Sequence, residues 1–158
     1  MCAILSPTYA QKHDFVWIAG DGNSPTDSSQ GGSTIDFNFT PVKVYYNYRE
    51  LNMFVCNASI CDTAGNLMFY TNGCDIAGVD DNILENGENI NTGYVHEIQC
   101  DQNNSGYTAG YQSLIILPLP ESDSLYYLFH KRIIYTNNPF TVKTDKLYFS
   151  VIDMSENN

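Results

Sequence analysis

The stretch DQNNSGYTAGYQ carries side-chain oxygens at a spacing that suits a hard cation. Asp101, Asn103 and Ser105 alternate with other residues and a glycine follows, as in the first half of a calcium-binding loop. The twelfth position is Gln112, where such a loop places a bidentate glutamate. The pattern predicts calcium at Asp101, Asn103 and Ser105, against the simpler alternative of a solvated loop, and no other cofactor is indicated.

A second stretch, VDDNILENGEN, gathers the carboxylates of Asp80, Asp81, Glu85 and Glu88. Clustered carboxylates can hold a metal or act as an acid–base pair, and glycosidases place two of them about 5–10 Å apart across a cleft. A charged surface loop is the commoner interpretation. The sequence contains no G-x-S-x-G motif, Walker loop or dinucleotide fingerprint. An enzyme is therefore only an alternative, as a carbohydrate-active protein that uses these loop carboxylates.

Cysteine is the third residue type that could carry chemistry. Four cysteines follow the first ten residues, and they are Cys56, Cys61, Cys74 and Cys100. Four cysteines allow three disulfide connectivities, and the sequence does not choose among them. Zinc ligands usually come in closely spaced pairs with histidine nearby, and the three histidines do not flank such a pair. The four cysteines are therefore candidates for disulfides or for buried free thiols.

Twelve tyrosines stand against one tryptophan, and aromatic side chains suit both strands and binding surfaces. Tyr126 and Tyr127 lie within a strand pattern, so that at most one of them faces the core. Tyr107 and Tyr111 lie in a long loop and are the better candidates for binding a ligand.

The charge and length of the chain restrict its partners. The 158 residues carry a formal charge of −11, which repels phosphate backbones and disfavours nucleic-acid binding. No long apolar run is present, so no membrane span is expected. The beginning MCAILSPTYAQ resembles the end of a secretory signal, with the small-x-small pattern Thr8-Tyr9-Ala10. We expect residues 1–10 to be a signal remnant, residues 11–158 to form one domain, and the protein to act outside the cell.

Strands are the elements expected to position these residues. TIDFNF alternates cleanly, and in LYFSVIDM the apolar side carries Leu147, Phe149 and Val151, opposite Ile152. In CDTAGNLMFYTNG, Asp62 to Gly65 predicts a turn and the next residues alternate along a return strand. VDDNILENG could form one helical turn, but no amphipathic helix of ten residues is present. The fold class is therefore all-β, built from antiparallel hairpins and meanders.

Weak self-similarity points to a radial array. SICDTAGNLMFYTNG and IILPLPESDSLYYLFHKR share one plan, in which an apolar strand, a polar turn and an aromatic-rich strand follow one another. Repeated hairpins of this kind predict a β-propeller, and at roughly 40–50 residues per blade the chain holds about three blades. Because the sequence stops at SENN, where a return strand would begin, we expect an incomplete propeller that is truncated at its C-terminus.

The order of these motifs resembles the N-terminal propeller-like region of secreted Bacteroidetes proteins, which accompanies PKD modules and type IX secretion sorting domains. The matching segments are Trp17 with Gly20, IDFNFTPV, CDTAGNLMFYTNG, ILENGENI, YQSLIILPLPESDSLYYLFH and LYFSVIDMSENN. They cover nearly all of residues 11–158, although GYVHEIQCDQNNSGYTAG is longer than the usual link. The resemblance implies secretion, a cell-surface setting, further domains in a longer parent chain, and no catalytic residues.

Two tripeptides, Asp62-Thr63-Ala64 and Asp123-Ser124-Leu125, are similar to the short O-glycosylation signal of Bacteroidetes. Both lie in predicted turns, where a sugar is tolerated, so Thr63 and Ser124 are candidate acceptors. Together these patterns predict a binding or scaffolding module that recognises a protein or glycan at the cell surface. The alternatives are the carbohydrate-active enzyme and a structural fragment with no independent function.

Overall fold

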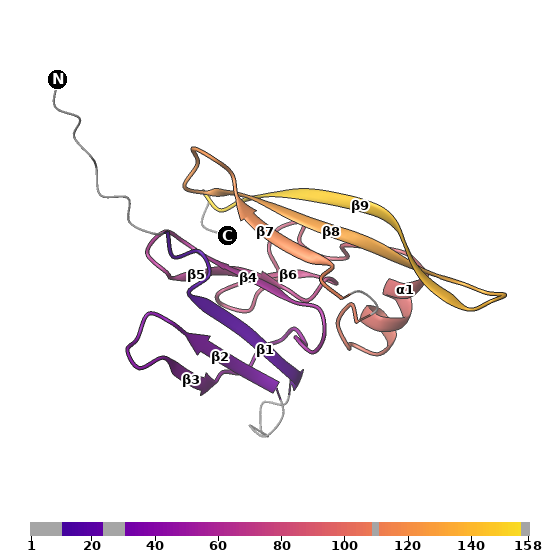
Figure 1. The fold of residues 1–158 in the computed structure, drawn as a ribbon, viewed down its shortest axis with the longest axis horizontal. Coiled ribbons are helices and arrows are strands. Elements are labelled where there is room, and N and C mark those ends of the chain that lie inside the picture. Colours follow the sequence, from indigo (N-terminus) through magenta and orange to yellow (C-terminus); the bar gives the residue numbers. More distant parts are fainter. Residues whose placement is uncertain (1–10, 24–30, 109–110, 156–158) are drawn as a thin grey trace.

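The computed structural model describes residues 11–23, 31–108 and 111–155. The expected signal remnant, residues 1–10, lies outside this range. The regular secondary structure of the described chain is mainly antiparallel β-strand, which confirms the all-β class (Figure 1). The strands are β1 Val16–Asn23, β2 Gly31–Asp36, β3 Lys43–Tyr46, β4 Ala58–Cys61, β5 Leu67–Thr71, β6 Ile76–Gly78, β7 Leu114–Pro118, β8 Leu125–Thr136 and β9 Thr141–Asp153.

The strands form three meanders of three strands each. The first sheet has the order β1-β2-β3, the second β4-β5-β6 and the third β7-β8-β9. β1 lies beside β4, and β4 lies beside β7, so the leading strands of the three sheets are neighbours (Figure 1). Among the described residues, none of the sheets closes on itself.

Hydrophobic clusters lie between consecutive sheets. Ile18 of the first sheet packs with Tyr70 and Ala77 of the second, together with Leu51 and Met53 from the preceding loop. A larger cluster joins the second sheet to the third, and its buried members are Cys56, Ile60, Phe69, Ile76, Leu114, Ile116, Tyr126, Leu128 and Ile152. Each sheet therefore stabilises the next by burying one of its apolar faces.

The β4–β5 hairpin has the predicted turn but a different strand pattern. Asp62 Oδ1 accepts hydrogen bonds from the amides of Ala64 and Asn66, as expected of an aspartate at a turn. A register shift between Ile60 and Cys61 then interrupts the alternation of β5. Leu67 consequently packs with the Tyr70 cluster instead of sharing a face with Phe69. The predicted alternation was wrong here because a β-bulge places an extra residue in one strand.

Residues 79–102 also differ from expectation. The segment predicted as a helical turn instead runs back along β6, where the Leu84 amide bonds to the Ile76 carbonyl and Ala77 bridges Ile83. Helical structure comes later, in α1 (Tyr94–His96) and the π-helix Glu97–Gln102. In the described chain, no helix is long and apolar enough to cross a membrane.

Candidate functional site

One face of the third sheet is apolar and exposed. The register aligns Ile115, Phe129 and Phe149 across the three strands, and Leu117, Tyr127 and Val151 form the neighbouring row. Because side chains alternate along each strand, Leu147 lies on the same side, while Ile116, Leu128 and Ile152 point into the core. We call this set the apolar face: Ile115, Leu117, Tyr127, Phe129, Leu147, Phe149 and Val151.

The apolar face is exposed, although the opposite face of the same sheet is buried. Leu147 is 72% exposed and Phe149 63%, whereas Ile152 on the opposite side is 7% exposed. The apolar side recognised in the sequence is thus the outer side of β9. The rings of Tyr127, Phe129 and Phe149 contact one another at centroid distances of 5.9 to 6.3 Å. The result is a continuous aromatic and aliphatic surface.

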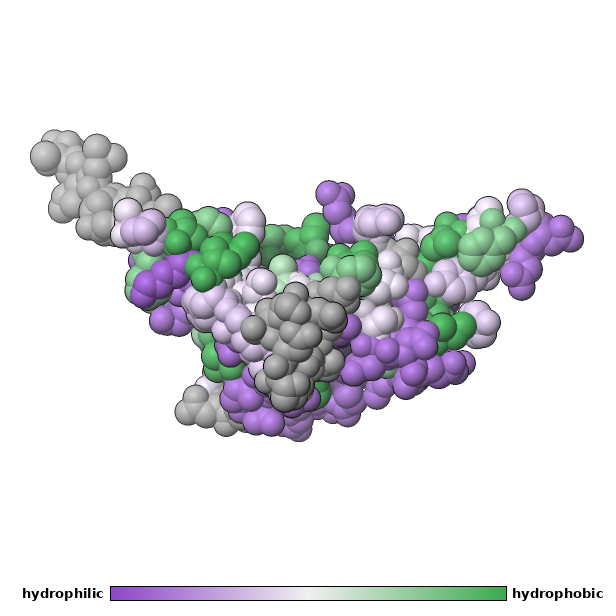
Figure 2. All heavy atoms as spheres, turned by 90° about the horizontal axis from the view of Figure 1, so that it is seen from below, coloured by the Kyte–Doolittle hydropathy of each residue, from purple (hydrophilic) through white to green (hydrophobic). Residues whose placement is uncertain are grey.

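Hydrophobic residues are distributed unevenly over the whole molecule. Figure 2 shows them mostly along one long edge of the view from below, while hydrophilic residues dominate the lower right. The first sheet also has apolar groups on its outer side, where Trp17 is 52% and Val44 68% exposed and the Trp17 ring lies 5.0 Å from that of Phe37.

In the acidic loop VDDNILENGEN, two carboxylates form hydrogen bonds or ion pairs within the fold. Asp80 accepts hydrogen bonds from the Asn82 side chain and amide, which lower the pKa of its carboxyl group. Asp81 accepts from Arg49 Nη1 at 3.0 Å and from the Tyr70 hydroxyl. Burial, reinforced by Asp81, raises the pKa of Tyr70.

The other two carboxylates are exposed. Glu85 lines a groove of about 370 Å³ between the loop and β9, together with Leu84, Ile90 and Asp153, and Glu88 faces solvent. Since Asp80 and Asp81 both have structural partners, the arrangement gives no support to an acid–base pair at those positions.

The structure separates the two tyrosines proposed as ligand contacts. Tyr107 is fully buried, so its assignment as an accessible ligand contact was wrong. Its hydroxyl accepts a hydrogen bond from the Ile133 amide at 2.7 Å, and its ring packs with Val95 and Ile133. Tyr111 is 83% exposed and stays a candidate.

The predicted calcium ligands lie at the end of the π-helix. Asp101 belongs to this helix, while Asn103 and Ser105 follow it. The Ser105 hydroxyl donates to the Gln99 carbonyl at 3.1 Å, so this oxygen already has a partner within the chain. The calcium site stays a prediction.

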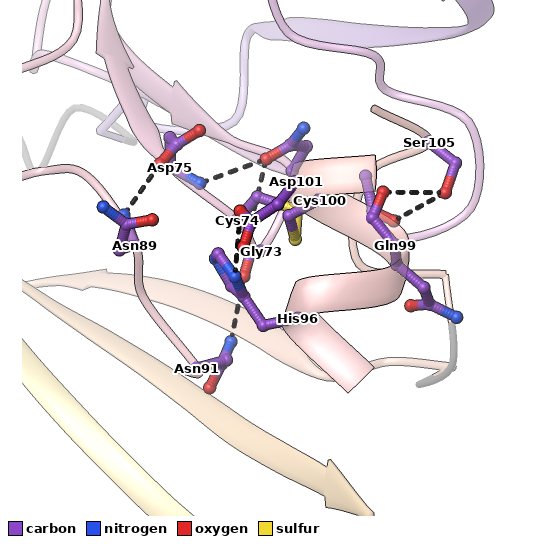
Figure 3. Close-up of a disulfide and its surroundings, with 12 residues drawn as sticks. Gly73, Cys74, Asp75, Asn89, Asn91, His96, Gln99, Cys100, Asp101 and Ser105 are labelled. Carbon is purple, nitrogen blue, oxygen red and sulfur yellow. Dashed lines mark hydrogen bonds and ion pairs between the residues drawn. A yellow bond between two sulfur atoms is a disulfide. The ribbon is translucent and has the colours of Figure 1, made fainter. Parts of the chain in front are cut away.

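The cysteines divide into a bonded pair and two thiols. Cys74 and Cys100 form a disulfide with a Cα–Cα distance of 5.7 Å (Figure 3). Cys56 and Cys61 are free and buried, so the prediction that they form disulfides was wrong, and they are the buried free thiols of the alternative. Burial raises the pKa of both thiols, and Cys56 Sγ lies 2.6 Å from Ser113 Oγ. These two cysteines serve as small core residues.

His96 lies against the disulfide and was missed as a site residue. A ligand atom of His96 and the two sulfur atoms all lie within 4.8 Å of one another. The His96 side chain is 4% exposed, and its Nδ1 lies 3.4 Å from Asp101 Oδ1. The buried Nε2 has no hydrogen-bond partner in the described chain. The available signal was the spacing His96-x₃-Cys100, which is within the range of metal-ligand pairs. We call His96, Cys74 and Cys100 the disulfide–histidine cluster.

The two candidate glycosylation sites differ in exposure. Thr63 is exposed in the Asp62 turn, whereas Ser124 is partly buried at the start of the β8 hairpin. Both sites stay predictions.

Comparison with protein-family models, curated proteins and solved structures finds no match to this chain. Function must therefore be inferred from the geometry of the apolar face and the disulfide–histidine cluster.

Proposed function

We propose that the protein is a secreted or cell-surface, β-propeller-type module that binds or scaffolds and has no catalytic activity of its own. The exposed apolar face of the third sheet carries this proposal. A protein in water leaves such a surface uncovered at a cost, which binding a partner removes.

The blade-like arrangement is supported by the order of the sheets. Each sheet is an antiparallel meander, and the leading strands β1, β4 and β7 follow one another in space. This is how blades are arranged in a propeller, where the first strands line the axis. The resemblance to the propeller-like region of secreted Bacteroidetes proteins favours the same architecture. The Cys74–Cys100 disulfide is typical of proteins that leave the cytosol.

The chemistry of the apolar face favours a polypeptide partner over a glycan. Four of its seven side chains are aliphatic, namely Ile115, Leu117, Leu147 and Val151, and these cannot hydrogen-bond to sugar hydroxyls. The other side of the same sheet is covered by the second sheet through a similar apolar surface. We therefore expect the partner to present an apolar β-sheet face that stacks on β7, β8 and β9 in the same manner.

The expected affinity is modest. Burying what remains exposed of seven side chains is worth about 5–10 kcal/mol, at roughly half the value of a fully buried side chain. Association itself costs about 4–15 kcal/mol, so binding is expected to be transient unless polar contacts at the rim add to it.

Site-specific photocrosslinking in the native host tests the proposal. A photoreactive phenylalanine analogue replaces Phe149 in one variant and Phe140 in the control, because Phe140 is equally exposed at 66% but lies at the tip of the β8–β9 hairpin. We expect a discrete polypeptide adduct from position 149 only. Adducts to glycan alone, or the same adducts from both positions, would contradict a polypeptide partner.

The captured partner then allows a quantitative test. Phe149→Lys is expected to weaken its binding about 30-fold, as for an interface hot spot worth about 2 kcal/mol. Phe140→Lys is expected to leave the affinity unchanged, and both variants are expected to keep the wild-type thermal melt. A glycan array paired with hydrolysis assays tests the absence of catalysis, since turnover would contradict it.

A further inference from the structure

We propose that the disulfide–histidine cluster is a redox-controlled binding site for a thiophilic divalent cation of the Zn²⁺ class, with Cys74, Cys100 and His96 as its ligands. The proposal goes beyond the binding function of the third sheet and rests on different residues.

The ligand set has the right chemistry and nearly the right dimensions. In a tetrahedral zinc site, with Zn–S of about 2.3 Å and Zn–N of about 2.0 Å, neighbouring ligand atoms are about 3.5–4 Å apart. The two sulfur atoms and a ligand atom of His96 lie within 4.8 Å of one another, so small side-chain movements bring them into range. Three protein ligands leave a fourth position for water or another ligand.

His96 has a carboxylate beside one ring nitrogen, as many metal-binding histidines do. Asp101 Oδ1 lies 3.4 Å from Nδ1, which leaves Nε2 as the ring nitrogen that has no hydrogen-bond partner in the described structure. Metal-ligating histidines commonly donate their other ring N–H to a carboxylate, which fixes the ring and its tautomer. A buried, unpartnered ring nitrogen costs free energy, and binding a metal would remove this cost.

The local backbone places His96 beside Cys100. The π-helix Glu97–Gln102 begins directly after His96 and carries Cys100. Its wider turn keeps residues four apart on nearly the same face. Cys74 approaches from the turn after β5 (Figure 3). Short π-helical segments are rare and are frequently found at functional sites.

The redox step needs a dithiol reductant. Cys100 is partly exposed and Cys74 is 2% exposed, so a thiolate of the reductant attacks Cys100 Sγ. This attack forms a mixed disulfide and releases Cys74 as a thiolate. The second thiol of the reductant then displaces Cys100, and the reductant leaves as its own disulfide. The two reduced cysteines bind the cation and release two protons to solvent. Exchange with an oxidised dithiol reverses the sequence and expels the cation.

Zinc titration of the full chain tests this site, with a competing chromophoric chelator as the readout. The oxidised protein is expected to bind no zinc above background, and the dithiol-reduced protein about one Zn²⁺ per chain. Replacing zinc with Co²⁺ is expected to give the visible bands of a tetrahedral thiolate site.

Variants separate this site from the two buried thiols. Asp101→Asn is expected to weaken zinc binding about 10- to 100-fold, as for other carboxylates that orient a ligating histidine. His96→Gln is expected to weaken it further while leaving the oxidised fold intact. The matched control, Cys56→Ala with Cys61→Ala, is expected to bind zinc like the wild type.

Trp17 fluorescence and circular dichroism monitor folding in the same samples. If reduction unfolds the chain, zinc is expected to restore the fold. The proposal is overturned if the reduced wild type binds no more zinc than Cys74→Ala/Cys100→Ala, or if it unfolds on reduction and zinc does not restore it.

Discussion

Asp62 shows how much one turn residue contributes to this fold. Its carboxylate accepts hydrogen bonds from the amides of Ala64 and Asn66 and from the Asn66 side chain. Partial burial opposes ionisation, but these hydrogen bonds outweigh it and lower the pKa below the ordinary value of 3.8. The stabilisation is therefore fully present above pH 3.8 and is lost as the pH falls through the lower pKa of the folded state.

We expect Asp62→Ala to reduce the free energy of unfolding by about 1–2 kcal/mol near neutral pH, since hydrogen bonds to a charged group are lost at a partly buried site. The difference from wild type is expected to shrink as the pH is lowered below 3.8. Urea unfolding at several pH values measures both effects. Asp14→Ala, at an exposed carboxylate, is the control, and a loss of stability in Asp62→Ala that does not vary with pH would contradict the explanation.

Residue-scale predictions from sequence succeeded where the cause was local. The turn at Asp62 and the opposite orientation of Tyr126 and Tyr127 follow from rules that involve only near neighbours in the chain. The burial of Tyr107 does not, because it depends on Ile133, 26 residues away. The same holds for His96, whose proximity to Cys74 arises from the fold.

At the scale of elements, the turn between β5 and β6 packs against the loop that carries Tyr107. Gly73 has a φ of 84°, and a Cβ placed on it would lie 2.7 Å from Tyr107 Cβ. Gly93 also has a positive φ, of 138°, but the nearest atom to its Cβ position is Arg132 Cδ at 3.9 Å. Substituting these two glycines therefore distinguishes backbone strain alone, at Gly93, from strain combined with a steric clash, at Gly73.

We expect Gly73→Ala to destabilise the protein by about 2–6 kcal/mol, because backbone strain and overpacking each cost about 1–3 kcal/mol. Gly93→Ala is expected to cost only the strain. Thermal or chemical denaturation of the two variants measures the difference. Equal losses in both would show that the Tyr107 contact contributes nothing.

The sequence predicted the strands, but it did not always predict which face of a strand is buried. In β9 the alternation was recognised, yet its more apolar side faces outward and Ile152 alone reaches the core cluster. A sequence pattern shows which residues share a face but not which face is covered when both are partly apolar. The bulge in β5 escaped prediction for a related reason, since its position depends on pairing with β4.

At the scale of the whole molecule, the chain forms three meanders one after another. This order explains why the same plan of strand, turn and strand recurs in the sequence. Each hairpin brings its own turn and its own apolar strands, so the plan recurs along the chain. The long polar segment before β7 could not be predicted in this way. Its path is fixed by the Cys74–Cys100 bond and by Tyr107 in a cluster with Val95 and Ile133, which are contacts over long sequence distances.

Because β8 and β9 are longer than β7, part of their hairpin is expected to unfold locally before the rest of the sheet. β7 pairs with β8 only as far as His130, so the rest of the β8–β9 hairpin is a two-stranded ribbon. Ile133 and Tyr135 pack on the cluster around Tyr107, Gln99 donates a hydrogen bond to the Tyr135 hydroxyl, and Arg132 bonds Asp145 across the ribbon. An isolated two-stranded hairpin is only marginally stable in water.

Amide hydrogen exchange is therefore expected to be graded along one continuous pair of strands, slow at Tyr126 to His130 and progressively faster toward Thr136 and Thr141. Trypsin is expected to cut first after Lys143, in the ribbon, while the three-stranded part of the sheet stays intact. Uniform protection along the hairpin would contradict this gradient. The same pair of strands is thus expected to be stable at its three-stranded end and to unfold locally at its two-stranded end.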